Sequence, residues 1–171
     1  MRKNQGVAPL IKDGILLLTD KDKFEKLIQY TRQRTGFTTL LIEKDYFLTL
    51  LLGIIASRNT PLVFKGGTCL NKCHLGFYRL SEDLDFVINT QNIPSRSERS
   101  ALFNDLQKLL TELFGTIIPN LKIIDSERFD SSKQYRLLLE YDSIVTKKQT
   151  IRFEITYKAP LQLQPVKKPI S

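Results

Sequence analysis

Asp83 and Asp85 are separated by a single residue at the start of an apolar segment that ends at Ile88. Such a segment predicts a β-strand, in which alternate side chains share one face, so both carboxylates point the same way while Leu84 and Phe86 point into the core. Two neighbouring carboxylates repel each other and are costly to bury. Their oxygens are ligands that suit Mg²⁺ or Mn²⁺. The pair predicts either a divalent cation site or a solvated strand edge.

A glycine pair precedes this segment. Residues 62–65 form a short apolar strand that ends in a lysine and is broken by Gly66 and Gly67, and a helix is expected to follow, with Thr68 as its N-cap and Leu70 on its buried side. Glycine lets the backbone approach a ligand, and the amides at a helix N-terminus attract phosphate. A phosphate-binding turn followed by a strand with two aspartates favours metal-assisted phosphoryl or nucleotidyl transfer.

Together these segments resemble the AbiEii/AbiGii-type nucleotidyltransferase toxins of the DNA polymerase β-like nucleotidyltransferase superfamily. The family motif reads glycine, glycine, serine or threonine, a spacer, then Arg-x-Ser-x-Asp-x-Asp. Here it is Gly66-Gly67-Thr68 followed by Arg79-x-Ser81-Glu82-Asp83-Leu84-Asp85. Upstream, Glu43-Lys44-Asp45-Tyr46 resembles the family's acidic-aromatic helix. The likeness covers about residues 43–157.

The resemblance implies a role for each motif residue. Asp83 and Asp85 would hold one or two Mg²⁺ ions that bind a nucleoside triphosphate. Glu154 matches the third carboxylate of the superfamily and would complete the second metal site and help to deprotonate the acceptor; a solvent-facing glutamate is the alternative. The residues expected to bind the nucleotide are Lys65, Gly66, Gly67, Thr68, Lys72, Arg79 and Ser81. The three cations among them pair with phosphate or with the carboxylates.

The order of predicted elements indicates an α/β (α+β) fold, a small mixed twisted sheet covered by helices. A helix capped by Asp20 ends at Gly36, and a second runs from residue 38 or 39 to residue 57 and is apolar nearly all round. An amphipathic helix follows Ser95 and is closed by Gly115. Further strands are expected at residues 121–125, 135–141 and 150–157, the last with Ile151, Phe153, Ile155 and Tyr157 on one face and Glu154 on the other.

We expect N-terminal helices over residues 1–60, a nucleotidyltransferase core over 61–158 and a tail or linker over 159–171. The family's C-terminal helical domain, with its lysine and Arg-Asp-x-x-Asp-type motif, has no counterpart here. A catalytically weak or silent nucleotide-binding module, or a kinase on the same fold, therefore stays an alternative to an active transferase.

Two other clusters have competing interpretations. Glu43, Lys44 and Asp45 form either an exposed patch at a helix start or a surface that faces the catalytic cleft. Cys69 and Cys73, one helical turn apart and followed by the only histidine, are expected to pack inside, because a structural zinc ion takes four ligands and no second ligand pair is present.

Composition narrows the partners. The chain has 171 residues, 42% of them hydrophobic, and a formal net charge of +8. One domain with a real core is expected, and anionic partners such as nucleotides or RNA are favoured. No signal peptide or membrane span is predicted, and two cysteines form no disulfide framework, which indicates the cytoplasm. The resemblance suggests a toxin with a cognate antitoxin and with tRNA or another RNA end as acceptor; a protein hydroxyl is the alternative.

Overall fold

The computed structural model describes residues 7–58, 60–75, 80, 82–89, 95–129, 133–158 and 165–168. The helices are α1 (Val7–Thr19), α2 (Lys21–Thr35), α3 (Thr39–Ala56), α4 (Gly66–Leu70) and α5 (Arg96–Ile117), and a π-helical turn, Asn71–Leu75, continues α4. The strands are β1 (Leu62–Lys65), β2 (Asp83–Asn89), β3 (Lys122–Phe129), β4 (Gln134–Asp142) and β5 (Lys148–Lys158).

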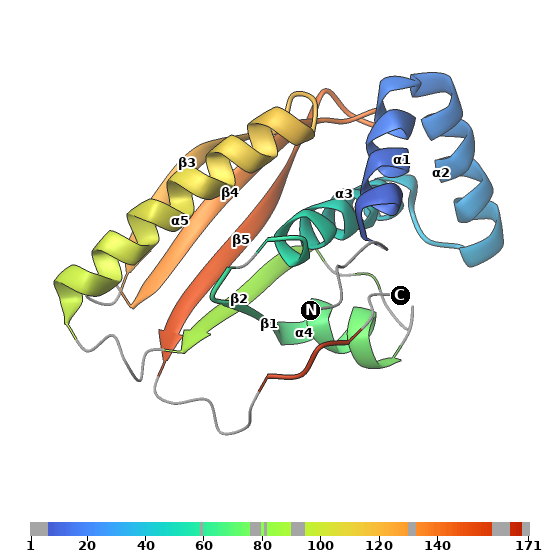
Figure 1. Cartoon of the computed structure of the whole chain (residues 1–171). Helices are drawn as coiled ribbons and strands as arrows, with labels where there is room; N and C mark the ends of the chain where they lie inside the picture. Colours follow the sequence, from blue (N-terminus) through green and yellow to red (C-terminus); the bar gives the residue numbers. More distant parts are fainter. Residues whose placement is uncertain are drawn as a thin grey trace.

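The strands form one mixed sheet in the order β1-β2-β5-β4-β3 (Figure 1). Among the described residues, strands β2 and β5 pair in parallel and the other three strand pairs are antiparallel. A parallel pair needs a long connection between its strands, and here that connection includes α5, β3 and β4. The central β2–β5 pair thus joins two segments that are about seventy residues apart in sequence. The predicted α/β class with a small mixed sheet is confirmed.

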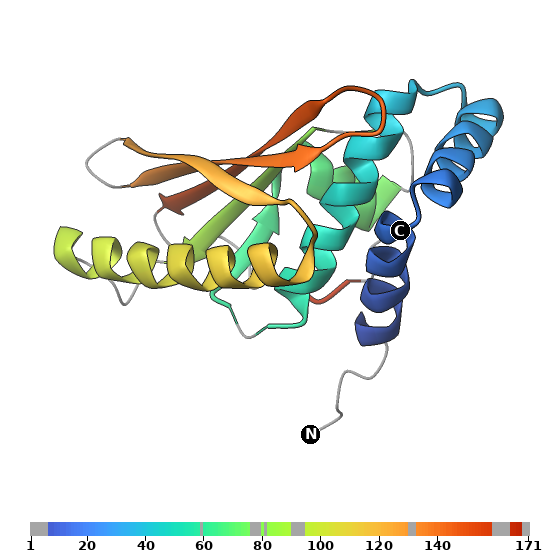
Figure 2. The same ribbon diagram turned by 90° about the horizontal axis from the view of Figure 1, so that it is seen from above.

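Helices α3 and α5 cover one face of this sheet (Figure 2). Phe103 of α5 stacks on Tyr135 of β4 with ring centroids 3.7 Å apart, and Phe47 of α3 stacks on Tyr141 of the same strand at 3.9 Å. Tyr135 and Tyr141 share a face because they are an even number of residues apart on one strand. The alternating apolar residues predicted for β5 are buried on this face as well. The opposite face of the sheet carries the polar residues.

Local sequence explains where the helices begin. The Asp20 side chain accepts a hydrogen bond from the Lys23 backbone N–H and caps α2, Thr38 caps α3 in the same way, and Ser95 with Glu98 forms a capping box at α5. Gly36 ends α2 in the left-handed conformation, with φ of 76°.

Helix α2 ends at Thr35 with Gly36 as its C-cap, as predicted. The predicted end of the last helix was wrong. Helix α5 passes through Gly115 to Ile117, because the apolar pattern that buries Phe114 continues at Ile118, which is completely buried. Glycine lowers helix stability without preventing a helix when packing continues beyond it.

Helices α1 and α2 pack on the outer side of α3. Tyr46 of α3 donates a hydrogen bond to the Gly14 carbonyl oxygen at 2.7 Å, and its ring lies 4.9 Å from that of Phe24 in α2. Burial raises the pKa of Tyr46 to about 12, so this phenol remains a donor at neutral pH. Residues 7–19 form α1, in the region where N-terminal helices were expected. Within the described residues, no helix is both long enough and apolar enough to cross a membrane.

Candidate active site on the polar face of the sheet

A row of five charged residues crosses the polar face, one from each strand. The pairing register aligns Lys65 with Asp85, Asp85 with Glu154, Glu154 with Arg136, and Arg136 with Glu127. Residues paired across neighbouring strands point to the same face of a sheet. The structure therefore brings Asp85 and Glu154 side by side at the centre of the sheet, as the sequence predicted, and places a lysine beyond one and an arginine beyond the other.

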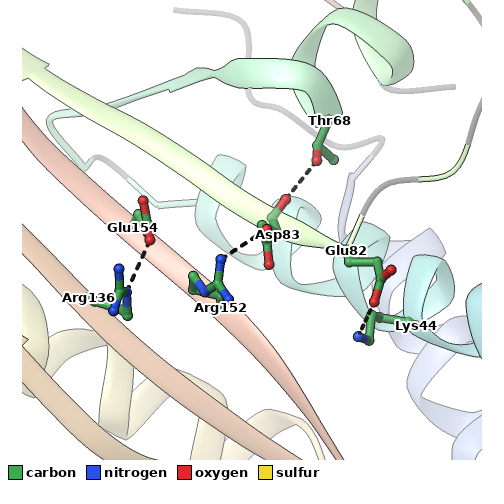
Figure 3. A network of polar contacts seen from close by, with 7 residues as sticks. All are labelled: Lys44, Thr68, Glu82, Asp83, Arg136, Arg152 and Glu154. Carbon is green, nitrogen blue, oxygen red and sulfur yellow. Dashed lines mark hydrogen bonds and ion pairs between the residues drawn. The ribbon is translucent and has the colours of Figure 1, made fainter.

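The arginines of this face were missed by sequence reasoning, although both lie on the polar side of predicted strands. Arg136 donates from Nε to Glu154 Oε1 at 3.1 Å (Figure 3). It also donates from Nη1 to Glu127 Oε2 at 3.3 Å. Arg152 Nη1 lies 3.6 Å from Asp83 Oδ2, an ion pair that is too long for a hydrogen bond. Each of two predicted site carboxylates, Asp83 and Glu154, thus has an arginine partner from a neighbouring strand.

The surroundings of Asp85 disfavour its ionised form. Burial is the main cause that raises its pKa above the ordinary aspartate value, and the charges of Glu154 and Asp83 raise it further. Lys65 and Arg152 act in the opposite direction, and the net effect is still a raised pKa. A cation placed here would relieve the repulsion and favour the ionised form.

The glycine turn lies directly against this carboxylate. Gly66 has φ of 79°, and a Cβ built on it would clash with Asp85 Oδ2 and lie 3.0 Å from Asp85 Cβ. Thr68 is buried, and its hydroxyl donates to the Asp83 carbonyl oxygen at 2.6 Å, which fastens the turn to β2 (Figure 3). Lys65, at the N-cap of α4, makes no side-chain cap.

Two expectations about this turn were wrong. The helix begins at Gly66, so Thr68 is not its N-cap, because its hydroxyl bonds β2 instead of a free amide of the helix. Leu70 is 52% exposed rather than buried. The inward side of the segment is taken by Thr68, Asn71 and Lys72, all of which are buried.

Replacing Gly66 by alanine is expected to lower both the melting temperature and the affinity for nucleotide with Mg²⁺. Alanine would be strained at the positive φ of this position, and its Cβ would displace the Asp85 side chain. Gly36→Ala is the matched control, since Gly36 has a similar φ of 76° and, among the described residues, no atom that its Cβ would meet within 4 Å. It should reduce stability only, by about 1 kcal/mol. Calorimetry and thermal melts of both variants check this; equal nucleotide binding by both would contradict it.

The charged residues at the start of α3 do not form an exposed patch, which was one of the two interpretations of this segment. Glu43 is buried and its carboxylate accepts hydrogen bonds from the Ser143 hydroxyl at 2.6 Å and the Ile144 N–H at 2.7 Å, in the β4–β5 turn. Burial raises its pKa. Lys44 is 11% exposed and its ammonium lies 2.6 Å from Glu82, just before β2. The start of α3 therefore holds the β4–β5 turn and the start of β2 in place.

Asp45, also at the start of α3, pairs with Lys72. The Lys72 ammonium lies 2.9 Å from each carboxylate oxygen and 2.8 Å from the Thr49 hydroxyl, and both charged side chains are almost fully buried. Lys72 was expected among the nucleotide-binding residues. In the structure its contacts with Asp45 and Thr49 tie the turn after Gly66 to α3.

Cys69 and Cys73 are free thiols and half-buried. Burial is the main cause that raises the pKa of Cys69 to about 11, with the nearby Cys73 thiol raising it further, so this thiol is protonated at neutral pH. Arg79 and Ser81, the remaining predicted nucleotide-binding residues, lie outside the described part of the chain.

Within that part, no three or more His, Cys, Asp or Glu side chains are gathered around a common point as a finished metal site. The donor set of Asp83, Asp85 and Glu154 nevertheless fits a hard divalent cation. All three offer carboxylate oxygens from adjacent strands. Burial first, and the charges of Glu154 and Asp83 in addition, raise the pKa of Asp85, and Gly66 lets the backbone approach that carboxylate closely.

Comparison with known proteins places the chain in a family. A sequence model described as "Nucleotidyl transferase AbiEii toxin, Type IV TA system" matches residues 50–171. Among solved structures the chain is similar to MenT4, a nucleotidyltransferase toxin from Mycobacterium tuberculosis H37Rv, with 23% identity and a TM-score of 0.43; the match covers 77% of this chain and 47% of that one. No curated protein matches. The chain therefore belongs to the AbiEii family of nucleotidyltransferase toxins of type IV toxin–antitoxin systems.

Proposed function

We propose that this protein transfers a nucleoside monophosphate from a nucleoside triphosphate to a hydroxyl group of an RNA end, such as that of a tRNA. The observation that carries the proposal is the in-register pairing of Asp85 with Glu154 next to the Gly66 turn. The chain spans about half the length of the MenT4 chain that it matches. Gly66, Asp85 and Glu154 all lie within the segment that matches the family model.

Asp83, Asp85 and Glu154 would hold Mg²⁺ or Mn²⁺, which when bound supplies positive charge to the triphosphate and its leaving group. The backbone amides of Gly66 and Gly67 would contact phosphate oxygens, since glycine has no side chain to keep a ligand away from the backbone. Lys65, in register with Asp85, adds a positive charge on the side of β1.

Glu154 is the candidate to accept the proton of the acceptor hydroxyl, which then attacks the α-phosphorus as pyrophosphate leaves. Arg136 holds Glu154 through Nε and is itself held by Glu127, and its guanidinium lies 4.9 Å from the centre of the Phe129 ring. Such a multiply contacted arginine orients the carboxylate before substrate binds. In this scheme Arg136 is a positioning residue.

A toxin of this family would be neutralised in the cell by a cognate antitoxin, and we propose such a partner here. The formal net charge of +8 is compatible with RNA, whose phosphates dominate the affinity of its complexes. A protein hydroxyl as acceptor is the second candidate, because the carboxylate row by itself does not distinguish hydroxyl donors.

Incubation with α-labelled and, separately, γ-labelled nucleoside triphosphates in the presence of cellular RNA and protein tests the proposal. Label from the α position should appear in the RNA fraction and require Mg²⁺ or Mn²⁺. Label only from the γ position would identify a kinase, and α-label in the protein fraction would identify the second acceptor. Nucleotide binding without any transfer would identify a silent nucleotide-binding module.

A further inference from the structure

A pocket of about 280 Å³ adjoins Asp83 on the polar face of the sheet. Its walls come from the start of α3, the residue before β2, and strands β2, β4 and β5; the lining residues are Lys44, Glu82, Asp83, Leu138, Thr150 and Arg152. Figure 3 shows four of these side chains, with both cations directed at acidic partners. The volume is below that of sites that enclose a whole drug-sized ligand. It suits one group of a larger substrate.

The pocket and the glycine turn lie on opposite sides of β2. Strand β1, which leads into Gly66, is one neighbour of β2, whereas β5, which supplies Thr150 and Arg152, is the other. In phosphoryl and nucleotidyl transfer the attacking and leaving oxygens are roughly in line, on opposite sides of the phosphorus. With the triphosphate at the glycine turn, the pocket is on the side from which the acceptor approaches.

The two cations of the pocket are held by partners that can exchange. Lys44 is 11% exposed and so its position is set by packing, but its partner Glu82 is 62% exposed. Arg152 lies 3.6 Å from Asp83, without a hydrogen bond. Exposed or loosely paired ions contribute little to stability, whereas a phosphate accepts charge-assisted hydrogen bonds from both lysine and arginine. A cation on Asp83 would free Arg152 and leave the pocket positively charged.

We propose that this pocket binds a phosphate group of the acceptor, with Lys44 and Arg152 as its ligands, and that the acceptor is therefore an RNA end whose terminal backbone phosphate sits beside the reacting hydroxyl. This rests on the proposed nucleotidyl transfer and deepens it. A peptide that offers a serine or tyrosine hydroxyl has no backbone anion to match two cations. Leu138 supplies apolar surface against which the adjoining sugar can pack.

The test uses the full chain, a short single-stranded RNA labelled at its 5′ end, and the double variant Lys44→Gln with Arg152→Gln. Fluorescence anisotropy should show RNA binding weakened by about tenfold for each lost charge-assisted contact. The slope of log Kd against log salt should fall by about 0.7, since each phosphate of a single strand that the protein neutralises contributes about 0.7. Calorimetry with nucleoside triphosphate and Mg²⁺ should show a smaller loss of nucleotide affinity than of RNA affinity, because Lys44 and Arg152 line the pocket rather than the glycine turn.

Lys108→Gln with Arg58→Gln is the matched control, because it removes the same charge from exposed positions on α5 and after α3. It should leave the RNA affinity close to that of the unmodified chain. A second RNA carries a neutral methylphosphonate at its last linkage. This RNA should bind the unmodified chain as weakly as ordinary RNA binds the pocket variant, and the pocket variant should show no further loss, because both changes remove one interaction.

Equal RNA affinity of the pocket variant and the control variant would overturn the proposal, as would a loss of nucleotide rather than RNA affinity, which would assign the pocket to the triphosphate. A protein acceptor whose KM rises in the pocket variant would also overturn it. Transfer by the unmodified chain with no effect of the pocket variant would refute this site alone. RNA binding through the pocket without any transfer would leave the site and refute the proposed activity.

Discussion

Asp85→Asn is expected to abolish nucleotidyl transfer while making the free protein more stable. In the proposed mechanism Asp85 helps to bind a cation, and such charge stabilisation of a transition state is worth several kcal/mol. Because about 1.4 kcal/mol is a factor of ten in rate, the loss should be at least about 10³-fold. The asparagine keeps the shape of the side chain beside Gly66. Transfer of α-label measures the loss, and Asp105→Asn, on α5 and exposed, is the control that should retain activity.

The gain in stability follows from the raised pKa of Asp85. A carboxyl whose pKa is higher in the folded than in the unfolded state makes its ionised form unfavourable, so the cost is present above the folded pKa and disappears as the pH falls below the unfolded pKa. Asparagine does not ionise. Asp85→Asn should therefore raise the free energy of unfolding by about 0.5–2 kcal/mol at neutral pH, and the difference should shrink under acidic conditions.

Mg²⁺ should reverse this order of stability. With nucleoside triphosphate and Mg²⁺ present, the unmodified chain should gain in melting temperature and the variant should not, since only the former keeps the full carboxylate set. Thermal melts at neutral and acidic pH, with and without these ligands, measure both effects. A variant that is less stable than the unmodified chain at neutral pH without ligands would contradict the account of Asp85.

Lys72→Met is expected to be the most destabilising of the substitutions considered. Its ammonium is 2.9 Å from the Asp45 carboxylate, and the two side chains are 2% and 10% exposed. Removing one member leaves a buried charge without its partner, which costs about 3–5 kcal/mol. For a chain of this size each kcal/mol lowers the melting temperature by about 2–4 °C. A fall on the order of 10 °C should result, measured by circular dichroism or calorimetry.

A double variant tests whether the loss of stability comes from the unpaired charge. Lys72→Met with Asp45→Asn removes both charges and should recover a large part of the lost stability, as replacing a complete buried pair costs less than breaking it. Lys23→Met, which breaks the exposed Asp20–Lys23 pair of α2, is the control and should change the melting temperature little. If the double variant were as unstable as the sum of its single variants, packing rather than charge would explain the loss.

The double variant also tests whether these contacts of α3 hold the glycine turn in place. Lys72 joins the turn that follows Gly66 to helix α3, and the neighbouring residues Glu43 and Lys44 join α3 to the β4–β5 turn and to the start of β2. We expect the double variant to recover stability more fully than nucleotide affinity, because the restored fold lacks the contact that holds the glycine turn in place.

Two segments of the candidate site could be predicted from local sequence pattern. Alternation along a strand depends only on backbone geometry, so the common face of Asp83 and Asp85, and the placement of Glu154 opposite the apolar face of β5, follow from local pattern. The glycine turn is equally local, as Gly66 adopts a positive φ. Capping residues such as Asp20 and Ser95 set helix starts within four residues.

Which charged residues contact one another could not be predicted from local pattern, because it depends on how distant elements pack. Asp45 and Lys72 are 27 residues apart in sequence, and Glu43 and Ser143 are 100 apart. Whether a charged segment is solvated or buried depends on whether a partner from another element offsets its desolvation, and sequence spacing does not contain that information. For the same reason the predicted N-cap Thr68 bonds β2 instead, and Arg136 and Arg152 become partners of Glu154 and Asp83 only because strands β4, β5 and β2 lie side by side in the folded sheet.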